Sequence, residues 1–465
     1  MRYISTRGKA PVLGFEDVLL TGLARDGGLY VPESWPAMAA DDLRALHGLP
    51  YPEAAVQIMR PYLDGAISDE DFGAMVADSY AVFGHPAVVP LRQLESGLWL
   101  LELFHGPTLA FKDVALQLVG RLFDHVLKRR GERITVVGAT SGDTGSAAIE
   151  ACRHCDMVEI FILHPKGRVS EVQRRQMTTV DSPNVHNIAV EGNFDDCQDL
   201  VKAMFNDAAF RDELNLSAVN SINWARIMPQ IVYYVTSAVA LGAPDREVTF
   251  VVPSGNFGNV FAAYAARQMG LPVQRLVVAS NSNDILTRFF DTGTMRIDGV
   301  EPTWSPSMDI QVSSNFERYL FDLCDRNPAT LAEEMRTFRD TGSLSVGDNR
   351  IAAARQLFDA GRVDDDATLA EIRRVHADSG EVVDPHTAVG IAVARVQPRT
   401  APVVCLATAH PAKFGDAVAQ AIGECPALPS RLSDLMELPE RAVALPNDLA
   451  AVEAHIRESL SESVR

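Results

Sequence analysis

Three segments of the chain carry residue types that could do chemistry together. Lys112 is a lone ammonium in the apolar run L-A-F-K-D-V-A, and a partly desolvated amine is a usable nucleophile and base near neutral pH. Two glycine-rich turns, at residues 138–145 and 251–259, have the composition of anion-binding loops. One buried amine and two such loops together predict a lysine that forms an imine with a phosphorylated aldehyde.

The second glycine-rich turn stands between an expected strand, T-F-V-V-P, and an expected helix, V-F-A-A-Y-A-A-R. Glycines let the backbone approach a ligand closely and turn N–H groups toward an anion, and a helix N-terminus adds favourable potential. The spacing is not that of a dinucleotide-binding or P-loop motif. A tight structural turn is the alternative to a phosphate site. The candidate phosphate-binding residues are Ser254, Gly255, Asn256, Phe257, Gly258 and Asn259.

The first glycine-rich turn has the same context but interleaves hydroxyl groups with its glycine. It offers both N–H and O–H donors, which suits a carboxylate or a phosphate. Asp143 would repel an anion, so we expect it to face a donor or to point away. Capping of the following helix is a compatible alternative, because Ser, Thr and Asp are common N-caps. The candidate ligand-binding residues are Thr140, Ser141, Gly142 and Thr144.

Lys112 precedes an amphipathic stretch, A-L-Q-L-V-G-R-L-F, and therefore stands at the start of an expected helix. The helix dipole disfavours a cation at that end. A lysine whose aliphatic stem packs on apolar neighbours while its amine reaches water is the alternative to a reactive one. Together with the two anion-binding loops, Lys112 predicts pyridoxal 5'-phosphate (PLP) chemistry.

A fourth segment, N-S-I-N-W-A-R at residues 220–226, groups a hydroxyl, amides and a guanidinium before an expected helix. Arginine binds phosphate bidentately and stays charged. The chain has 42 basic and 61 acidic residues and a net charge of −19, so a site for an anionic substrate must be locally positive. Ser221, Asn223 and Arg226 are candidates for that role, and pairing of Arg226 with a surface carboxylate is the alternative.

The sequence predicts an α/β fold that positions these segments. From about residue 90 onward, short β-branched runs alternate with helical stretches, as at 146–152 and 260–269, which predicts parallel sheets covered by helices. In such sheets ligands bind at the carboxyl ends of the strands, where both glycine-rich turns fall. The expected strands are residues 134–137, 159–163, 185–190, 248–252, 276–279 and 403–407.

Composition narrows the possible functions. With 465 residues, 47% of them hydrophobic, the chain should form two or three domains. Its negative charge argues against nucleic acid or an anionic membrane as a partner, and no segment reaches the roughly 20 apolar residues of a membrane span. The six cysteines are scattered apart from Cys152 and Cys155, which lack a second pair at zinc spacing. We therefore expect free thiols, no metal and a cytoplasmic location.

The chain resembles a known family, threonine synthase, in its longer microbial-type branch. The resemblance covers nearly the whole chain, and its motifs occur in the family's order. It rests on H-G-P-T-L-A-F-K-D (105–113), A-T-S-G-D-T-G (139–145), N-S-I-N-W-A-R (220–226), P-S-G-N-F-G-N (253–259), L-A-T-A-H-P-A-K-F (406–414) and the opening segments Y-I-S-T-R-G and 15–32.

The resemblance implies conversion of O-phospho-L-homoserine and water to L-threonine and phosphate, the last step of threonine biosynthesis. It implies that Lys112 holds PLP covalently, that residues 254–259 bind the cofactor phosphate, and that Asp143 lies near the cofactor's O3' hydroxyl. Thr408 would meet the pyridine nitrogen. The substrate carboxylate would be bound by Thr140, Ser141, Gly142 and Thr144, and the substrate phosphate by Ser221, Asn223 and Arg226.

The resemblance also implies a fold. We expect two parallel-sheet α/β domains of the fold type II PLP enzymes, which are tryptophan synthase β-like, with an added N-terminal domain. The expected segments are a mixed N-terminal domain at 1–88, a smaller α/β domain at 89–235, a larger one at 236–430 and a charged helical tail at 431–465. The chain is expected to act as a monomer or homodimer on a small-molecule substrate.

Two alternatives remain open from the sequence. A PLP-dependent threonine or serine dehydratase, or a related phospholyase, needs the lysine and the phosphate loop but not the N-S-I-N-W-A-R segment. A catalytically silent homologue could keep the fold, although the retained Lys112 argues against it. A nicotinamide-dependent dehydrogenase is disfavoured because neither glycine-rich turn has the required spacing.

Overall fold

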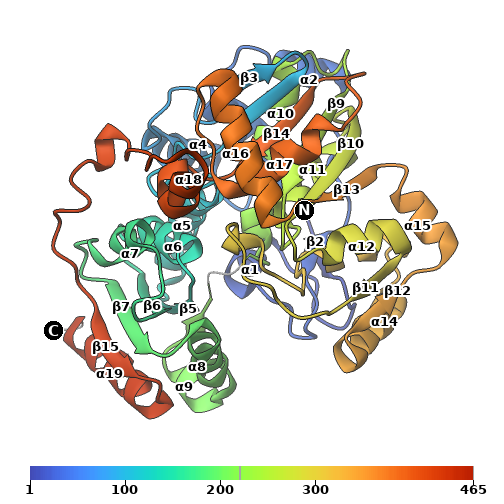
Figure 1. Cartoon of the computed structure of the whole chain (residues 1–465). Coiled ribbons are helices and arrows are strands. Elements are labelled where there is room, and N and C mark those ends of the chain that lie inside the picture. Colours follow the sequence, from blue (N-terminus) through green and yellow to red (C-terminus); the bar gives the residue numbers. More distant parts are fainter. Residues whose placement is uncertain (219–220, 464–465) are drawn as a thin grey trace. The chain divides into compact units, whose positions relative to one another are not determined.

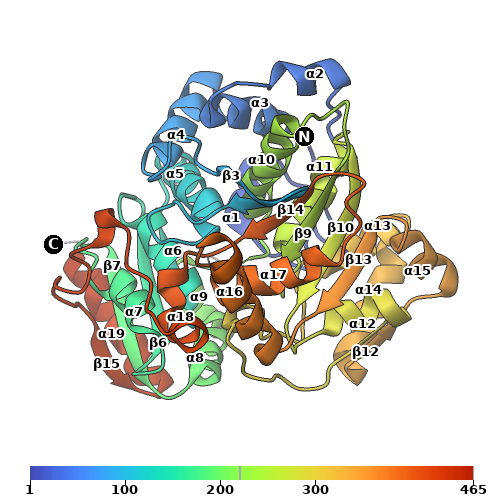
Figure 2. The same ribbon diagram turned by 45° about the horizontal axis from the view of Figure 1, so that its top comes forward.

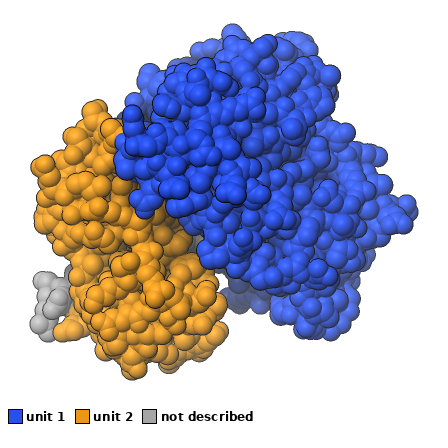
Figure 3. Space-filling model, viewed as in Figure 1, with its two compact units in different colours: residues 1–105, 221–426 blue, residues 106–220, 427–465 orange. Residues whose placement is uncertain are grey.

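The computed structural model describes residues 1–218 and 221–463, and the chain divides into two compact units. The first unit comprises Met1–His105 and Ser221–Pro426, and the second comprises Gly106–Asn220 and Ala427–Arg465 (Figures 1 and 3). Within the described residues, no helix combines the length and the apolar composition needed to cross a membrane.

The first unit is built around a six-stranded sheet in the order β13-β10-β9-β14-β4-β3. Neighbouring strands are parallel from β13 through β4, and the edge strand β3 is antiparallel to β4. The carboxyl ends of the parallel strands therefore meet at one edge of the sheet. Its strands are β3 (Leu91–Glu95), β4 (Leu98–Glu102), β9 (Val248–Pro253), β10 (Val273–Ser280), β13 (Phe358–Arg362) and β14 (Val403–Ala407).

Helices cover both faces of this sheet. Val251 belongs to a buried cluster that includes Val389 of α17, whereas the ring of Phe250 contacts that of Tyr234 in α10 at a centroid distance of 4.9 Å. Successive side chains of a strand point to opposite faces, so α17 and α10 lie on opposite faces. Figure 2 shows α17 in front of β9 and β14. The principal helices after residue 221 are α10 (Trp224–Ala240), α11 (Gly258–Gln268), α12 (Ile285–Thr292), α13 (Phe316–Leu323), α14 (Pro328–Thr341), α15 (Asp348–Ala354), α16 (Asp365–Ser379), α17 (Pro385–Arg395) and α18 (Gly415–Ile422).

The remaining elements of the first unit are shorter. Strands β1 and β2 form an antiparallel pair, as do β11 and β12. Their bounds, with those of the N-terminal helices and two 3-10 turns, are β1 (Tyr3–Ser5), α1 (Phe15–Thr21), β2 (Tyr30–Pro32), α2 (Ala40–Ala45), α3 (Tyr51–Leu63), α4 (Asp69–Ala81), β11 (Thr294–Arg296), η1 (Pro306–Met308), β12 (Ser343–Ser345) and η2 (Pro411–Phe414).

The second unit is built around a five-stranded, entirely parallel sheet in the order β15-β7-β6-β5-β8. Phe161 of this sheet packs with Leu200 of α8 and Ile456 of α19 in one buried cluster. The elements are α5 (Lys112–Arg130), β5 (Ile134–Ala139), α6 (Asp143–Cys152), β6 (Val158–Pro165), α7 (Glu171–Thr178), β7 (Val185–Glu191), α8 (Phe194–Asn206), α9 (Ala208–Glu213), β8 (Leu216–Ser217), η3 (Ser430–Leu432), β15 (Val443–Pro446) and α19 (Leu449–Ser463).

The predicted α/β architecture with parallel sheets is confirmed, and all six expected strands are present, 403–407 with the same ends and the other five with slightly different ends. The C-terminal stretch differs from the expected helical tail, because β15 precedes its helix and pairs with β7. The residues of this strand, V-A-L-P, show no apolar–polar alternation of the kind that marks a half-buried strand.

The first unit joins two stretches that lie far apart in the sequence. Strand β4 (98–102) pairs in parallel with β14 (403–407), although the sequence analysis grouped residues 89–105 with the lysine segment. Hydrophobic patterning identifies a strand but does not identify its partner, so this pairing is decided by the tertiary fold.

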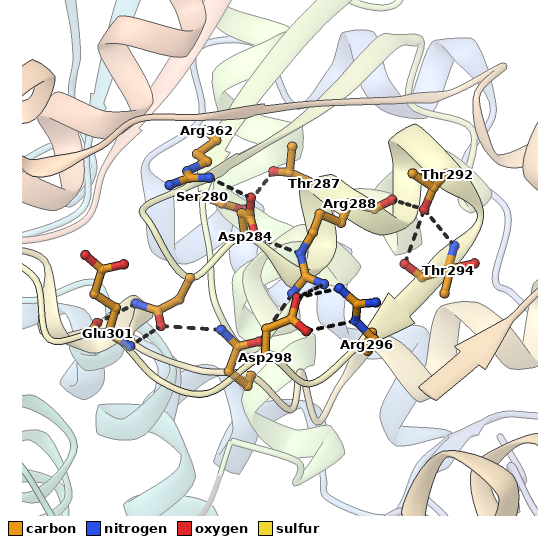
Figure 4. A network of polar contacts seen from close by, with 12 residues as sticks. Ser280, Asp284, Thr287, Arg288, Thr292, Thr294, Arg296, Asp298, Glu301 and Arg362 are labelled. Atoms are coloured by element: carbon orange, nitrogen blue, oxygen red, sulfur yellow. Dashed lines mark hydrogen bonds and ion pairs between the residues drawn. The ribbon is translucent and has the colours of Figure 1, made fainter. Parts of the chain in front are cut away.

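A polar network holds the chain that follows β10 (Figure 4). Asp284 accepts a hydrogen bond from Arg288 Nε at 2.8 Å and forms an ion pair with Arg362, the last residue of β13, at 3.3 Å. Arg288 also pairs with Asp298 at 2.7 Å. The alternating charges connect the start of α12 to the end of β13 and to the loop that follows β11.

Helices α5 and α6 of the second unit approach unusually closely at Gly120. A Cβ on Gly120 would lie 2.2 Å from the carbonyl oxygen of Ala151 in α6. Leu116, Ala147 and Ala151 form the buried contact beside it. Because the two helices start at Lys112 and Asp143, this approach sets how those residues lie relative to each other.

We predict that Gly120→Ala forces α5 and α6 apart and destabilises the protein by about 1–3 kcal/mol, as overpacking does. Gly73→Ala is the matched control, because Gly73 lies within α4 and a Cβ there would meet nothing within 4 Å. Alanine at Gly73 should instead stabilise the helix, by up to about 1 kcal/mol. Thermal unfolding of the two variants should therefore shift in opposite directions, and equal midpoints would contradict the prediction.

Candidate functional site

Two predicted segments of the first unit lie at the same edge of its sheet. Ser254 follows β9 and Thr408 follows β14, and these strands are parallel neighbours. Ser254 and Thr408 are both buried, with 8% and 6% exposure. The structure thus brings together two segments that the sequence separates by about 150 residues, as expected where parallel strands end.

The turn between β9 and α11 has an uncommon backbone. Phe257 has φ +59°, in the left-handed region, and its buried ring packs edge-on against Phe316 at 4.8 Å. A bulky residue holds this conformation only where packing enforces it. Ser254 Oγ accepts a hydrogen bond from Phe257 N at 3.1 Å, which closes the turn. Helix α11 then begins at Gly258, so its first N–H groups open toward the turn.

Gly255 lies against a neighbouring stretch of backbone. A Cβ there would be 3.2 Å from Met308 Cα and 3.1 Å from Ile310 Cδ1. The missing side chain therefore lets Met308 and Ile310 lie directly against this turn. The N–H groups at the start of α11, which open toward the turn, fit a bound phosphate group.

Arg226 is buried, with part of its guanidinium unpaired among the described residues. It is 5% exposed, and burial lowers its pKa to about 10. Its Nε and one terminal nitrogen have no hydrogen-bond partner among residues 1–218 and 221–463. Burying such a guanidinium is unfavourable in free energy, because it loses its hydration and its donors stay unpaired, unless an anion binds to it.

The turn before Arg226 is ordered by Asn223. Asn223 Oδ1 accepts a hydrogen bond from Ala225 N at 2.9 Å and caps α10, while its Nδ2 donates to Leu19 O at 2.7 Å. Ser221 is half-buried at the start of this turn. Asn220, the first residue of the motif, lies outside the described residues. Asn223 thus sets the helix start from which Arg226 projects.

The second unit places the predicted lysine beside the predicted aspartate. Lys112 is the first residue of α5 and Asp143 the first of α6, and Lys112 Nζ lies 3.4 Å from Asp143 Oδ2. Gln173 Nε2 donates to the other carboxylate oxygen at 2.8 Å. Ser170 Oγ in turn donates to Gln173 Oε1 at 2.8 Å. Asp143 therefore faces donors on both oxygens.

The hydroxyl-rich turn before α6 is organised by Thr140. Its Oγ1 accepts hydrogen bonds from Gly142 N at 3.0 Å and from Gly145 N at 2.9 Å. Gly142 has φ +144°, and a Cβ there would lie 2.5 Å from Gln173, so only glycine fits. Ser141 is exposed and Thr144 is half-buried. Both hydroxyls remain near the surface, where a ligand could reach them.

Gln173 was missed by the sequence analysis. It lies 30 residues after Asp143, inside a helix with no glycine-rich or hydroxyl-rich neighbours, and no local pattern distinguishes it.

His105, in the first unit, bonds Glu102 Oε2 through Nε2 at 2.7 Å. All six cysteines carry free thiols.

Comparison with protein families divides the chain into three consecutive matches. A model described as threonine synthase N terminus matches residues 2–80, and one described as pyridoxal-phosphate dependent enzyme matches residues 82–345. A third, described as threonine synthase, C-terminal, matches residues 387–456.

Individual relatives match along nearly the full length. The threonine synthase of Pseudomonas aeruginosa is 59% identical over 98% of this chain and 98% of its own. That of Schizosaccharomyces pombe is 45% identical, covering 90% of this chain and 88% of its own.

Solved structures match equally well. The PLP-bound threonine synthase of Brucella melitensis superposes with a TM-score of 0.98 at 54% identity, over 99% of both chains. The yeast threonine synthase gives 0.94 at 40% identity, also over 99% of both. The two parallel-sheet units are those of a fold type II PLP enzyme. Matched along its whole length in this way, the chain belongs to the threonine synthase family of pyridoxal-phosphate dependent enzymes.

Proposed function

We propose that this chain converts O-phospho-L-homoserine and water into L-threonine and inorganic phosphate, with PLP as its cofactor. The observation that carries the substrate assignment is the buried guanidinium of Arg226, whose Nε and one terminal nitrogen are unpaired in the described part of a chain of net charge −19. A phosphorylated substrate supplies a counter-charge for this group.

The cofactor phosphate is assigned to Ser254, Gly255, Asn256, Phe257, Gly258 and Asn259. The N–H groups at the start of α11, which open toward this turn, support this assignment. When bound, PLP acts as an electron sink that stabilises the negative charge left when a proton is removed from the substrate. Thr408 is assigned to the pyridine nitrogen, where a hydroxyl neither requires nor imposes a charge on the ring.

Lys112 holds the cofactor and moves protons. Its amine is assigned the removal of the substrate's Cα proton and the later return of a proton to the same carbon. Asp143 is assigned a place beside the cofactor's O3' hydroxyl, 3.4 Å from Lys112 Nζ. Gln173 keeps the Asp143 carboxylate from rotating, because it holds one oxygen while the other faces the amine.

The two anionic ends of the substrate are assigned to different segments. Thr140, Ser141, Gly142 and Thr144 bind the carboxylate through hydroxyl and backbone N–H donors. Ser221, Asn223 and Arg226 bind the phosphate that leaves Cγ, before water adds at Cβ. Asn223 keeps one amide hydrogen for this purpose after its contact with Leu19.

A dehydratase acting on an unphosphorylated amino acid is the alternative activity. It would leave the Arg226 guanidinium without a counter-charge during turnover, and it is disfavoured for that reason. A monomer or homodimer in the cytoplasm is part of the same proposal.

The purified protein incubated with O-phospho-L-homoserine should release threonine and phosphate in equal amounts. Lys112→Ala should abolish both products, because no other amine is assigned to the Cα proton. Lys128→Ala is the matched control: Lys128 lies in the last turn of the same helix, half-exposed and paired with Asp124 and Asp156, and its loss should leave turnover intact. Phosphate without threonine would instead identify a phospholyase.

Arg226→Met should lower kcat/KM for O-phospho-L-homoserine roughly 10–150-fold or more, as expected when charge-assisted hydrogen bonds to the phosphate are lost. It should also raise the thermal unfolding midpoint, because it removes a buried unpaired charge. The affinity for PLP should not change.

Arg267→Met provides the control for Arg226→Met, since Arg267 is an exposed arginine of α11 and its loss changes the net charge equally. Steady-state kinetics and thermal melts of the two variants separate the effect of losing the Arg226 guanidinium from the effect of changing the net charge. Unchanged kinetics in Arg226→Met would remove the basis for a phosphorylated substrate.

A further inference from the structure

Asn315 is a fully buried residue next to the turn at 254–259. It immediately precedes α13, and its backbone N–H donates to Asn256 O at 3.1 Å. Its side-chain Nδ2 lies 3.1 Å from the position that a Cβ of Gly258 would occupy. The carboxamide of Asn315 therefore adjoins the first residue of α11, where the N–H groups of that helix open.

The orientation of this carboxamide is set by Arg318. A terminal nitrogen of the guanidinium donates to Asn315 Oδ1. A guanidinium has donors and no acceptor, so the atom that it contacts must be the oxygen of the amide. The NH₂ group of Asn315 thus points away from Arg318, and it has no hydrogen-bond partner among the described residues.

Asn259, the second residue of α11, has the same arrangement. Its Oδ1 accepts hydrogen bonds from the hydroxyls of Tyr233 and Tyr234. Burial holds the pKa of both phenols well above the usual range, so both remain O–H donors. Asn259 Nδ2 is likewise buried without a partner in the described part of the chain.

Arg318 also adds positive charge beside this turn. Its other hydrogen bonds go to Tyr30 O, at 3.0 Å, and to Ile222 O. These acceptors are neutral carbonyls, and the carboxylate of Glu317, whose charge also acts on Arg318, is itself paired with Arg7 at 2.9 Å. The potential at the turn is therefore favourable for an anion.

We propose that Asn315 is a further donor to the anion bound at residues 254–259, and that Arg318 and Tyr234 are positioning residues that fix Asn315 and Asn259 respectively. The anion is the cofactor phosphate, so this inference rests on the proposed function. Two buried amide groups have their oxygens saturated by donors and their N–H groups unpaired. Such groups are costly in an apo protein, and a phosphate accepts hydrogen bonds from both. A trapped water molecule is the other occupant that could accept them.

Asn315→Asp tests the proposal, because it keeps the oxygen that Arg318 contacts and replaces the donor with an acceptor. The new carboxylate pairs with Arg318, so the fold should be retained and the thermal midpoint unchanged or higher. The dissociation constant of PLP for the apoenzyme, measured by absorbance titration, should rise about a hundredfold, since a charge-assisted hydrogen bond is lost and a repulsion is added. The affinity for pyridoxal, which lacks the phosphate, should stay unchanged.

Asn327→Asp is the matched control. Asn327 is exposed, caps α14 in the same unit and can keep its cap contacts as aspartate, so it changes the net charge equally. It should leave both affinities unaltered. If Asn315→Asp binds PLP as tightly as the wild type, or loses pyridoxal and PLP affinity equally, the inference is overturned and a trapped water remains the occupant. If wild-type protein itself binds PLP no better than pyridoxal, the phosphate assignment under the proposed function fails as well.

The positioning role of Tyr234 has its own readout. Tyr234→Phe should weaken PLP binding about fivefold, because Tyr233 can still hold the amide oxygen. In an Asn259→Ala background the same change should have no further effect on PLP affinity. A full fivefold loss in that background would show that Tyr234 acts on the fold and not through Asn259.

Discussion

The structure of the first unit depends on two buried arginine side chains, whose positive charge neighbouring groups do not fully neutralise, in a chain that is acidic overall. Arg226 and Arg318 are at least 95% buried, and burial lowers the pKa of Arg226 to about 10 and that of Arg318 to about 9. Desolvation of two guanidiniums opposes folding, and the apolar packing around α10, α13 and the six-stranded sheet must offset it. The gain is local attraction for anions in a molecule whose overall charge of −19 repels them.

Two polar groups of the candidate site each have one oxygen held by a neighbouring side chain. Gln173 holds one oxygen of Asp143, and Arg318 holds the oxygen of Asn315. The other oxygen of Asp143 faces Lys112 Nζ at 3.4 Å, and the NH₂ group of Asn315 has no hydrogen-bond partner among the described residues, so the orientation of each planar group is fixed. Preorganisation of this kind lowers the reorganisation needed on binding, which is where a rigid scaffold contributes to catalysis.

The scaffold itself achieves this with close backbone approaches. Gly120 lets α5 lie against α6, and Gly255 lets residues 308–310 lie against the turn at 254–259. The strained φ of Phe257 is maintained by packing against Phe316. Small residues and strained backbone angles thus occur where functional groups must lie close to one another. The packing of the surrounding helices and sheets offsets the free energy of that strain.

The sequence by itself determined the α/β class, the six expected strands, the family and the residues proposed for the site. These features are local, since periodicity, turn chemistry and motif spacing are written in consecutive residues. Only the tertiary structure decided that β4 lies beside β14, that β15 completes the second sheet, that Gln173 holds Asp143, and that Asn315 lies beside the turn at 254–259. Strand pairing and side-chain contacts of this kind join positions tens to hundreds of residues apart, and no local pattern encodes which partner a side chain will meet.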